Sequence, residues 1–176
     1  MATGGILSIT EVNALQSEQF EWLFGNVIEH CPEAAKKVAS KRPFATCEAL
    51  KIAFDNYLDT LKTAEKEIIL QKHPELAGKL LDEGKLTGES QNEQKLAGLD
   101  CLSKEERQTL SDFNSLYKEK FQFPFVICAR ENKMQTILSA IEIRVENSKE
   151  DEINLGIEEV KKICRIRVGD LVWPDK

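Results

Sequence analysis

The sequence has few of the residues that build metal centres and phosphate-binding loops. It contains two histidines, nine glycines and five prolines in 176 residues. Two histidines exclude a His-rich metal centre, and no glycine-rich phosphate loop is present. No apolar run approaches the roughly 20 residues that a membrane-spanning helix needs. The net charge of −6 argues against a dedicated nucleic-acid-binding protein. We therefore expect no metal, no membrane and no nucleic acid among its partners.

Cysteine is present, but in no pattern typical of a metal site or of a disulfide framework. The five cysteines are an odd number, and no two have the C-x-x-C spacing. We expect them to be reduced and to act as small apolar side chains in an intracellular, reducing compartment. The first residues have neither the basic region nor the apolar stretch of a secretion signal.

Apolar residues recur at helical spacing along most of the chain. Hydrophobic residues make up 41% and charged residues 31%, as in an ordinary globular domain. Phe20, Leu23 and Phe24 share one helical face, and Asn13 and Gln16 before them have the spacing of a capping box. The pattern predicts about eight helices. They lie before Pro32, over 33–41, 50–61 and 63–73 with a further turn at 75–81, from Thr87 or Ser90 to near Gly98, from Ser103 through Phe121, over 137–145, and from Ser148 toward Gly169 as the C′ residue.

One segment, from Phe121 to Ala129, does not follow the helical pattern. It reads Phe-Gln-Phe-Pro-Phe-Val-Ile-Cys-Ala, and Pro124 makes it a poor central strand. We interpret it as a buried extended segment between helices. Because the length fits one domain, we predict an all-α fold with a disordered end at residues 1–10 and a single domain at residues 11–176.

Two polar positions interrupt the helical pattern in the middle of the chain. His73 ends a predicted helix before Pro74, and an imidazole exchanges protons near neutral pH; the alternative is a surface histidine at a helix C-terminus. Ser90, Glu93 and Gln94 share one helical face, which offers a hydroxyl, a carboxylate and an amide to a polar ligand. The alternative is that Ser90 and Glu93 form a capping box.

Arg167 is the third such position. It lies on or beside the apolar stripe of the last predicted helix. A buried guanidinium must pair with a carboxylate or an anionic ligand, whereas an arginine near a chain end can also extend to solvent. Together with His73 and Glu93, it would supply what is needed to bind and rearrange a small anionic heterocycle.

The motifs around these positions resemble those of one enzyme family. They are His73-Pro-Glu-Leu-Ala-Gly78, Ser90-Gln-Asn-Glu-Gln94 and the segment from Phe121 to Ala129, preceded by Phe20-x-x-Leu-Phe-Gly-Asn26 and Arg42-Pro-Phe44 and followed by Glu158-Glu-Val-Lys-Lys-Ile-Cys164 with Arg167. In this order they resemble the OHCU decarboxylase (2-oxo-4-hydroxy-4-carboxy-5-ureidoimidazoline decarboxylase) family of urate degradation. The resemblance covers nearly the whole chain.

The resemblance implies a cofactor-free carboxy-lyase with an all-α fold, usually a homodimer. Its substrate would be OHCU, the product of hydroxyisourate hydrolysis, and its products (S)-allantoin and CO2. By motif position, His73 would be the catalytic proton donor, with Glu93 and Arg167 as its acidic and cationic partners. The predicted substrate-binding residues are Pro74, Ser90, Gln91, Asn92, Glu93, Gln94, Ile127, Cys128, Ala129, Arg130 and Glu131.

The chemistry of the reaction agrees with these roles. Loss of CO2 leaves an electron pair on a ring carbon beside C=N or C=O, which is itself an electron sink, so no cofactor is required. The protein has to orient the carboxylate, stabilise the developing charge and deliver a proton to one face. Arg167 suits a carboxylate or a ring carbonyl. The Glu93 carboxylate is suited to fixing the histidine tautomer or to binding the ureido N–H groups.

Two other functions fit the same residues. One is a hydrolase acting on a cyclic ureide, with His73 as a general base toward water. The other is a non-catalytic helical binding protein on the same scaffold. We expect an intracellular location. The family resemblance favours the peroxisome, but the chain ends in Trp173-Pro-Asp-Lys176 and not in a Ser-Lys-Leu tripeptide, so the cytoplasm is an equal expectation.

Overall fold

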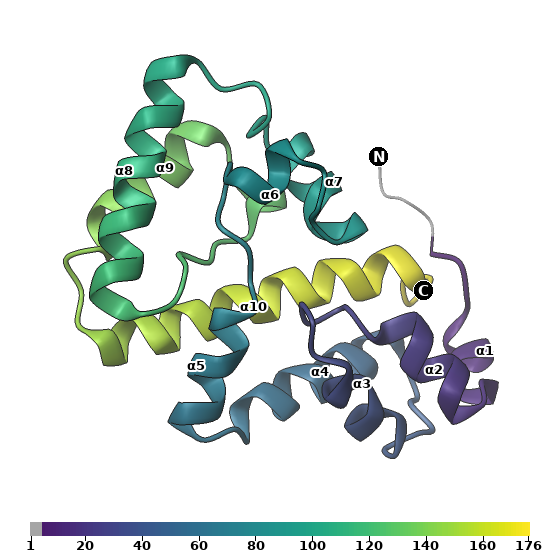
Figure 1. Ribbon diagram of the computed structural model, residues 1–176. Helices are drawn as coiled ribbons and strands as arrows, with labels where there is room; N and C mark the ends of the chain where they lie inside the picture. The colour runs from purple at the N-terminus through teal and green to yellow at the C-terminus, as the bar shows by residue number, and fades with distance from the viewer. Residues whose placement is uncertain (1–4) are drawn as a thin grey trace. The chain divides into compact units, whose positions relative to one another are not determined.

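Helices account for all the regular secondary structure that the computed structural model describes, which covers residues 5–176 (Figure 1). Ten α-helices and one short 3-10 helix form within these residues, and the only β-type pairing among them is an isolated bridge between Leu7 and Val172. The predicted all-α class is confirmed. The helix number is higher than predicted because α1 (Ile9–Ala14) and α6 (Lys79–Asp82) form as separate short helices.

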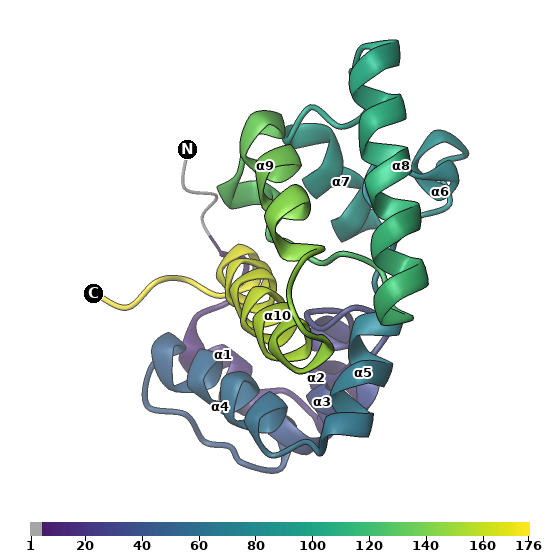
Figure 2. The same ribbon diagram turned by 90° about the vertical axis from the view of Figure 1, so that its left-hand side faces the viewer.

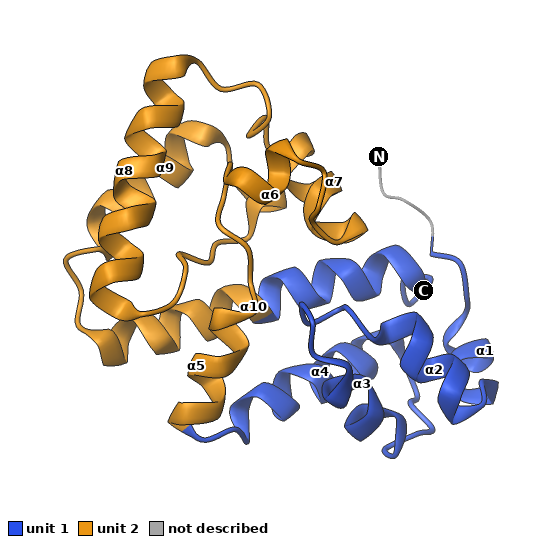
Figure 3. Ribbon diagram, viewed as in Figure 1, with its two compact units in different colours: residues 1–62, 161–176 blue, residues 63–160 orange. Residues whose placement is uncertain are grey.

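The chain divides into two compact units (Figure 3). Unit 1 comprises the residues up to 62 together with 161–176, and unit 2 comprises residues 63–160. The long helix α10 (Lys149–Leu171) contributes its first half to unit 2 and its second half to unit 1. Among the helices of residues 5–176, none is both long and apolar enough to cross a lipid bilayer.

Unit 1 contains α1, α2 (Ser17–Phe24), α3 (Pro32–Ala39) and α4 (Cys47–Asp59). Helix α3 packs against both α2 and α4. The aromatic core of unit 1 consists of Phe20, Phe24 and Phe54. The ring centroids of Phe20 and Phe24 are 4.6 Å apart, and those of Phe24 and Phe54 are 6.3 Å apart. The apolar spacing that predicts a helix around Phe20 and Phe24 therefore does mark a buried face.

Three predictions for unit 1 are wrong in detail. Asn13 caps no helix; its amide exchanges two hydrogen bonds of 2.8 Å with the backbone of Phe44. Ser8 and Glu11 form the capping box that begins α1.

Gly169 lies inside α10, since Val172 N still donates to Val168 O. Residues 1–4 of the expected disordered end lie outside the described residues, whereas residues 5–10 pair with the end of α10 and begin α1.

Unit 2 contains α5 (Thr63–Gln71), α6, α7 (Gly88–Leu96), α8 (Lys104–Phe121), the 3-10 helix η1 (Ala129–Glu131) and α9 (Met134–Arg144). Helices α8 and α9 contact each other; they lie next to each other in Figure 1, and Figure 2 shows them on either side of α7. The predicted capping box of Ser103 and Glu106 is present at the start of α8. Thr87, one of the two predicted starts of α7, is its N-cap and accepts from Ser90 N.

The segment after α8 is extended and buried, as predicted. Gln122 ends α8 in the left-handed conformation, and every residue from 123 to 129 is buried. The rings of Phe123 and Phe125 lie 6.0 and 5.4 Å from that of Tyr117. Aromatic packing against α8 therefore holds the segment in place.

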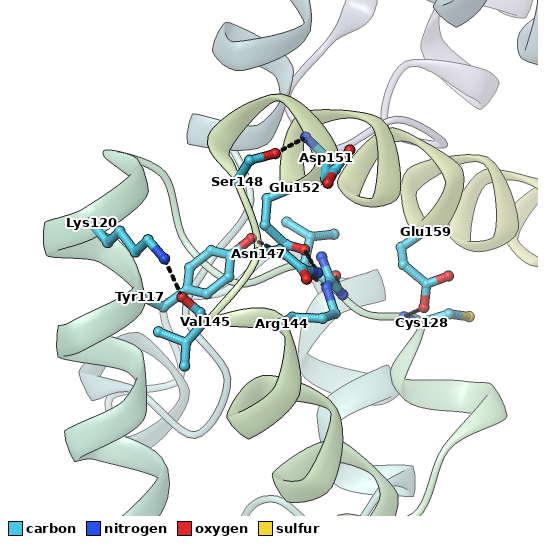
Figure 4. A network of polar contacts seen from close by, with 11 residues as sticks. Tyr117, Lys120, Cys128, Arg144, Val145, Asn147, Ser148, Asp151, Glu152 and Glu159 are labelled. Atoms are coloured by element: carbon cyan, nitrogen blue, oxygen red, sulfur yellow. Dashed lines mark hydrogen bonds and ion pairs between the residues drawn. The ribbon is translucent and has the colours of Figure 1, made fainter.

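A polar network also fixes this segment (Figure 4). The Glu152 carboxylate is fully buried and accepts from Tyr117 Oη at 2.6 Å, Arg144 Nε at 2.9 Å and Asn147 Nδ2 at 2.9 Å. Arg144 Nη1 donates to Val126 O at 2.9 Å. Burial and the hydrogen bond to Glu152 both raise the pKa of Tyr117, so the phenol stays neutral and continues to donate.

Candidate active site

His73 lies at the end of α5, where Pro74 stops the helix. Its backbone N–H donates to Leu70 O at 3.2 Å, in a final turn after Gln71. The residue is only 7% exposed, so the alternative of a surface histidine is wrong. His73 and Pro74 line a cavity of about 310 Å³ together with Phe123 and Pro124 from the extended segment. The imidazole is therefore in a partly desolvated setting suited to proton transfer.

The loop that follows His73 is held by two buried amide side chains. Gln94 Oε1 accepts from Ala77 N at 2.9 Å, and Gln94 Nε2 donates to Glu75 O at 3.2 Å. Asn114 Nδ2 donates to Leu76 O at 3.0 Å. Gln94 belongs to α7 and Asn114 to α8, so both helices determine where the histidine loop lies.

Helix α7 presents a buried polar face, as the spacing predicts. Ser90, Glu93 and Gln94 are buried, whereas Asn92 is exposed and Gln91 is half-buried. Ser90 is inside the helix and Thr87 is the N-cap, so the capping-box alternative for Ser90 is wrong. A hydroxyl, a carboxylate and an amide are thus directed inward from one helix.

The stretch from Ile127 to Glu131 packs beside α7 through η1. Ile127, Cys128 and Ala129 are buried, Arg130 is half-buried and Glu131 is exposed. The Cys128 backbone N–H donates to Glu159 Oε1 at 3.4 Å (Figure 4). Burial, with the nearby carboxylates of Glu131, Glu159 and Glu93, raises the pKa of the Cys128 thiol to about 11. A thiol that stays protonated at neutral pH is no nucleophile, as we expect from its apolar surroundings.

Arg167 lies in unit 1, where it is 3% exposed. Its Nη2 is 3.1 Å from Glu29 Oε2, and its Nη1 donates to Asn26 O at 2.8 Å. Glu29 is 1% exposed, so this is a buried ion pair and the solvent-extended alternative is wrong. Sequence reasoning missed Glu29. A buried arginine generally requires a carboxylate partner, so the sequence indicates that an aspartate or glutamate lies beside Arg167. The sequence does not indicate which one.

The structure thus distributes the predicted residues over the two units. Unit 2 holds His73, Pro74, residues 90–94 and residues 127–131, with α7 tied both to the histidine loop and to η1. Unit 1 holds Arg167. All five cysteines are free, as expected, and only Cys101 is exposed. No group of three or more His, Cys, Asp or Glu side chains among residues 5–176 is arranged to hold a metal ion.

These features define a class, an all-α protein with a buried imidazole and a buried carboxylate on neighbouring segments of one unit. The sequence model of a family described as OHCU decarboxylase matches residues 13–169. The chain is 43% identical to the 2-oxo-4-hydroxy-4-carboxy-5-ureidoimidazoline decarboxylase of Xenopus laevis, with 97% of each chain covered. It is also 43% identical to the enzyme of the same name from Amia calva, over 94% of this chain and 95% of that one.

A solved structure agrees with this result. The crystal structure of an OHCU decarboxylase in the presence of (S)-allantoin superposes with a TM-score of 0.65 at 25% identity, covering 88% of this chain and 96% of that one. The chain belongs to the OHCU decarboxylase family. It is therefore an enzyme of the decarboxylase class, as the motifs predict.

Proposed function

We propose that this protein decarboxylates OHCU to (S)-allantoin and CO2 in urate degradation, without a cofactor. The observation that carries the proposal is that the segments bearing His73 and Glu93 are hydrogen-bonded to each other. The residue after Glu93, Gln94, holds the backbone of the loop that follows His73, with hydrogen bonds of 2.9 and 3.2 Å. An acid–base group and a carboxylate on segments fixed to each other are what a stereoselective proton delivery requires.

The proposed step needs no external reagent. The bond between the ring carbon and its carboxylate breaks, CO2 leaves, and the electron pair delocalises into the adjacent C=N or C=O of the ring. His73 then delivers a proton to one face of that carbon. Glu93 fixes the imidazole tautomer or binds the ureido N–H groups, and it lies on the same helix face as Ser90.

Arg167 would bind the carboxylate or a ring carbonyl. Its contact with Glu29 offsets its charge and holds its guanidinium plane, so we assign it a role in directed hydrogen bonding more than in supplying net positive charge. Gln91 would contribute its side-chain carbonyl. This oxygen is buried and has no hydrogen-bond partner among the described residues, which suits it to a ureido N–H.

The remaining predicted contacts belong to the same proposal. Pro74, Ser90, Ile127, Cys128 and Ala129 would line the substrate pocket, the last three largely through backbone groups. Asn92, Arg130 and Glu131 would stand at its rim, since none of the three is buried. We further propose that residues 11–176 form a single catalytic domain, that the enzyme is a homodimer, and that it works in the peroxisome or the cytoplasm.

The test uses freshly generated OHCU and measures CO2 release and the circular dichroism of the allantoin formed. We expect acceleration over the uncatalysed rate and a single allantoin enantiomer. His73→Asn should lower kcat by about 100-fold or more, in line with the contribution of a general acid. His30→Asn is the matched control, because His30 is the other histidine and its side chain is 62% exposed.

Each other outcome contradicts the proposal in a distinct way. Racemic allantoin formed at the uncatalysed rate, with folded protein present, would exclude catalysis and leave a binding protein. Consumption of a cyclic ureide without CO2 release would indicate a hydrolase. Equal activity of the two histidine variants would remove His73 from the reaction.

A further inference from the structure

The loop at residues 75–78 has little regular structure of its own. It joins α5 to α6, and Ala77 has a φ of 51°, in the left-handed region that residues other than glycine and asparagine rarely adopt. Glu75, Gly78 and Lys79 line the cavity beside His73 and also a second cavity of about 340 Å³. A loop with open space beside it needs hydrogen bonds to keep one conformation.

The two amides supply these hydrogen bonds at three successive residues. Gln94 binds the carbonyl of Glu75 and the N–H of Ala77, and Asn114 binds the carbonyl of Leu76 between them. Both amide residues are buried, Gln94 at 3% and Asn114 at 7% exposure. Leu76 is itself buried, so its backbone carbonyl cannot exchange Asn114 for bulk water.

We propose that Asn114 is a positioning residue for His73, acting together with Gln94 on the loop that follows it. Asn114 anchors the centre of the loop to α8, and Gln94 ties its two flanking residues to the helix that carries Glu93. The pair thereby sets the distance between the imidazole and the carboxylate. For Gln94, this role through the protein backbone is additional to the direct substrate contact expected from the family motif. The inference rests on the proposed catalytic role of His73.

The test compares three variants in the full-length protein. Asn114→Ala removes the donor, Asn114→Asp keeps the shape but replaces the N–H by an oxygen, and Asn154→Ala is the matched control on an exposed site of α10. For Asn114→Ala we expect kcat to fall 10- to 100-fold while KM changes less than threefold, because a small displacement of the proton donor affects the chemical step most. Asn154→Ala should leave both constants unchanged.

Two further measurements separate positioning from general loss of structure. Amide hydrogen exchange at Ala77 should become at least tenfold faster in Asn114→Ala while the unfolding transition stays cooperative. In Asn114→Asp, a protonated carboxyl can again donate to Leu76 O. The kcat of this variant relative to the unchanged protein should therefore rise as the pH falls, whereas the ratio for Asn114→Ala should stay flat.

Several results would overturn the inference. One is an unchanged kcat in Asn114→Ala despite faster exchange at Ala77; another is a change in KM alone. If Asn114→Ala does not fold, the pH dependence of kcat in Asn114→Asp tests the inference instead. A relative kcat of Asn114→Asp that does not rise as the pH falls would then contradict the positioning role. Failure of the proposed function is distinguishable, because the unchanged protein would then release no CO2 while the exchange at Ala77 still reports on the loop.

Discussion

Each unit of the molecule contains a buried glutamate that is paired with an arginine, and the two pairs differ in what surrounds them. In unit 2, Arg144 binds Glu152 and the carbonyl of Val126, and its guanidinium carbon lies 4.5 Å from the centre of the Phe125 ring. In unit 1, Arg167 binds Glu29 and the carbonyl of Asn26. Only Arg167 belongs to the family motifs.

The comparison separates a structural pair from a proposed functional one. Both oxygens of each carboxylate are bound within the protein, since Glu152 accepts from Tyr117, Arg144 and Asn147, and Glu29 accepts from Asn26 and Arg167. Arg144 also holds the extended segment by its backbone. A buried ion pair therefore marks an active site only when its chemistry suits the substrate, and burial by itself does not identify one.

The largest expected effect is on the stability of unit 2. Glu152→Ala should lower the free energy of unfolding by about 3–5 kcal/mol, because it leaves Arg144, whose side chain is only 11% exposed, without its carboxylate. Urea unfolding followed by circular dichroism measures this. The double variant Arg144→Met/Glu152→Leu should recover most of the loss. A loss below about 1 kcal/mol for Glu152→Ala would contradict the structural assignment.

The second effect concerns the two arginines and activity. Arg167→Lys retains the charge but loses the planar fork, so we expect kcat/KM to fall by about 100-fold, or about 2.7 kcal/mol. Arg144→Lys should change kcat/KM of the folded protein less than threefold while lowering its midpoint in urea. Steady-state kinetics on both variants test the contrast. Similar losses of activity in the two would break the distinction between the pairs.

A smaller effect compares the two halves of α10. A Cβ at Gly156, in unit 2, would lie 2.8 Å from Leu70 Cδ2, whereas a Cβ at Gly169, in unit 1, would meet only Lys51 Nζ at 3.8 Å. Gly156→Ala should therefore destabilise by about 1–2 kcal/mol, since overpacking outweighs the gain in helix propensity. Gly169→Ala should stabilise by up to about 1 kcal/mol. Thermal unfolding measures the change in stability of both variants. A change of the same sign in both would contradict the packing of Gly156 against Leu70.

The smallest effect is on thiol reactivity. Burial raises the pKa of Cys47 and Cys164 in unit 1 and that of Cys128 in unit 2. A raised pKa means less thiolate at pH 8, so these thiols should not react with iodoacetamide in the native protein. A hydrogen bond with the Asp100 side chain also raises the pKa of Cys101, so exposure is what distinguishes this thiol, and mass spectrometry should find it alkylated first. Early labelling at Cys128 would contradict its burial beside α7.

The helices, their starts at Ser103 and Thr87, and the extended segment after Phe121 were predictable because they depend on neighbours in the sequence. A capping box closes over three residues, and an amphipathic helix repeats every three to four residues. The position of Asn13 shows where such reasoning fails. Its side chain has the spacing of a cap but binds Phe44, 31 residues away, which no local rule anticipates.

The candidate site shows the same division. The motifs identified His73, Glu93 and Arg167 as candidates, and the apolar stripe placed Arg167 near the core. For each of the three residues, the sequence left both a functional and a purely structural interpretation open. Burial excluded the surface histidine and the solvent-extended arginine. Glu29 and Asn114 were found only in the structure, because neither a carboxylate that binds a distant side chain nor an amide that binds a distant backbone carbonyl has a sequence pattern of its own.

The sequence by itself determined the helical class, the family and the residue types available for acid–base chemistry, since periodicity, capping and motif order are local properties. The tertiary structure alone decided which polar groups are buried and what they bind. Arg167 meets a glutamate 138 residues away, and Gln94 and Asn114 meet a loop 17 to 38 residues before them. The physical reason is that desolvation makes each buried polar group require a partner, while only the packing of the helices determines which partner is within reach.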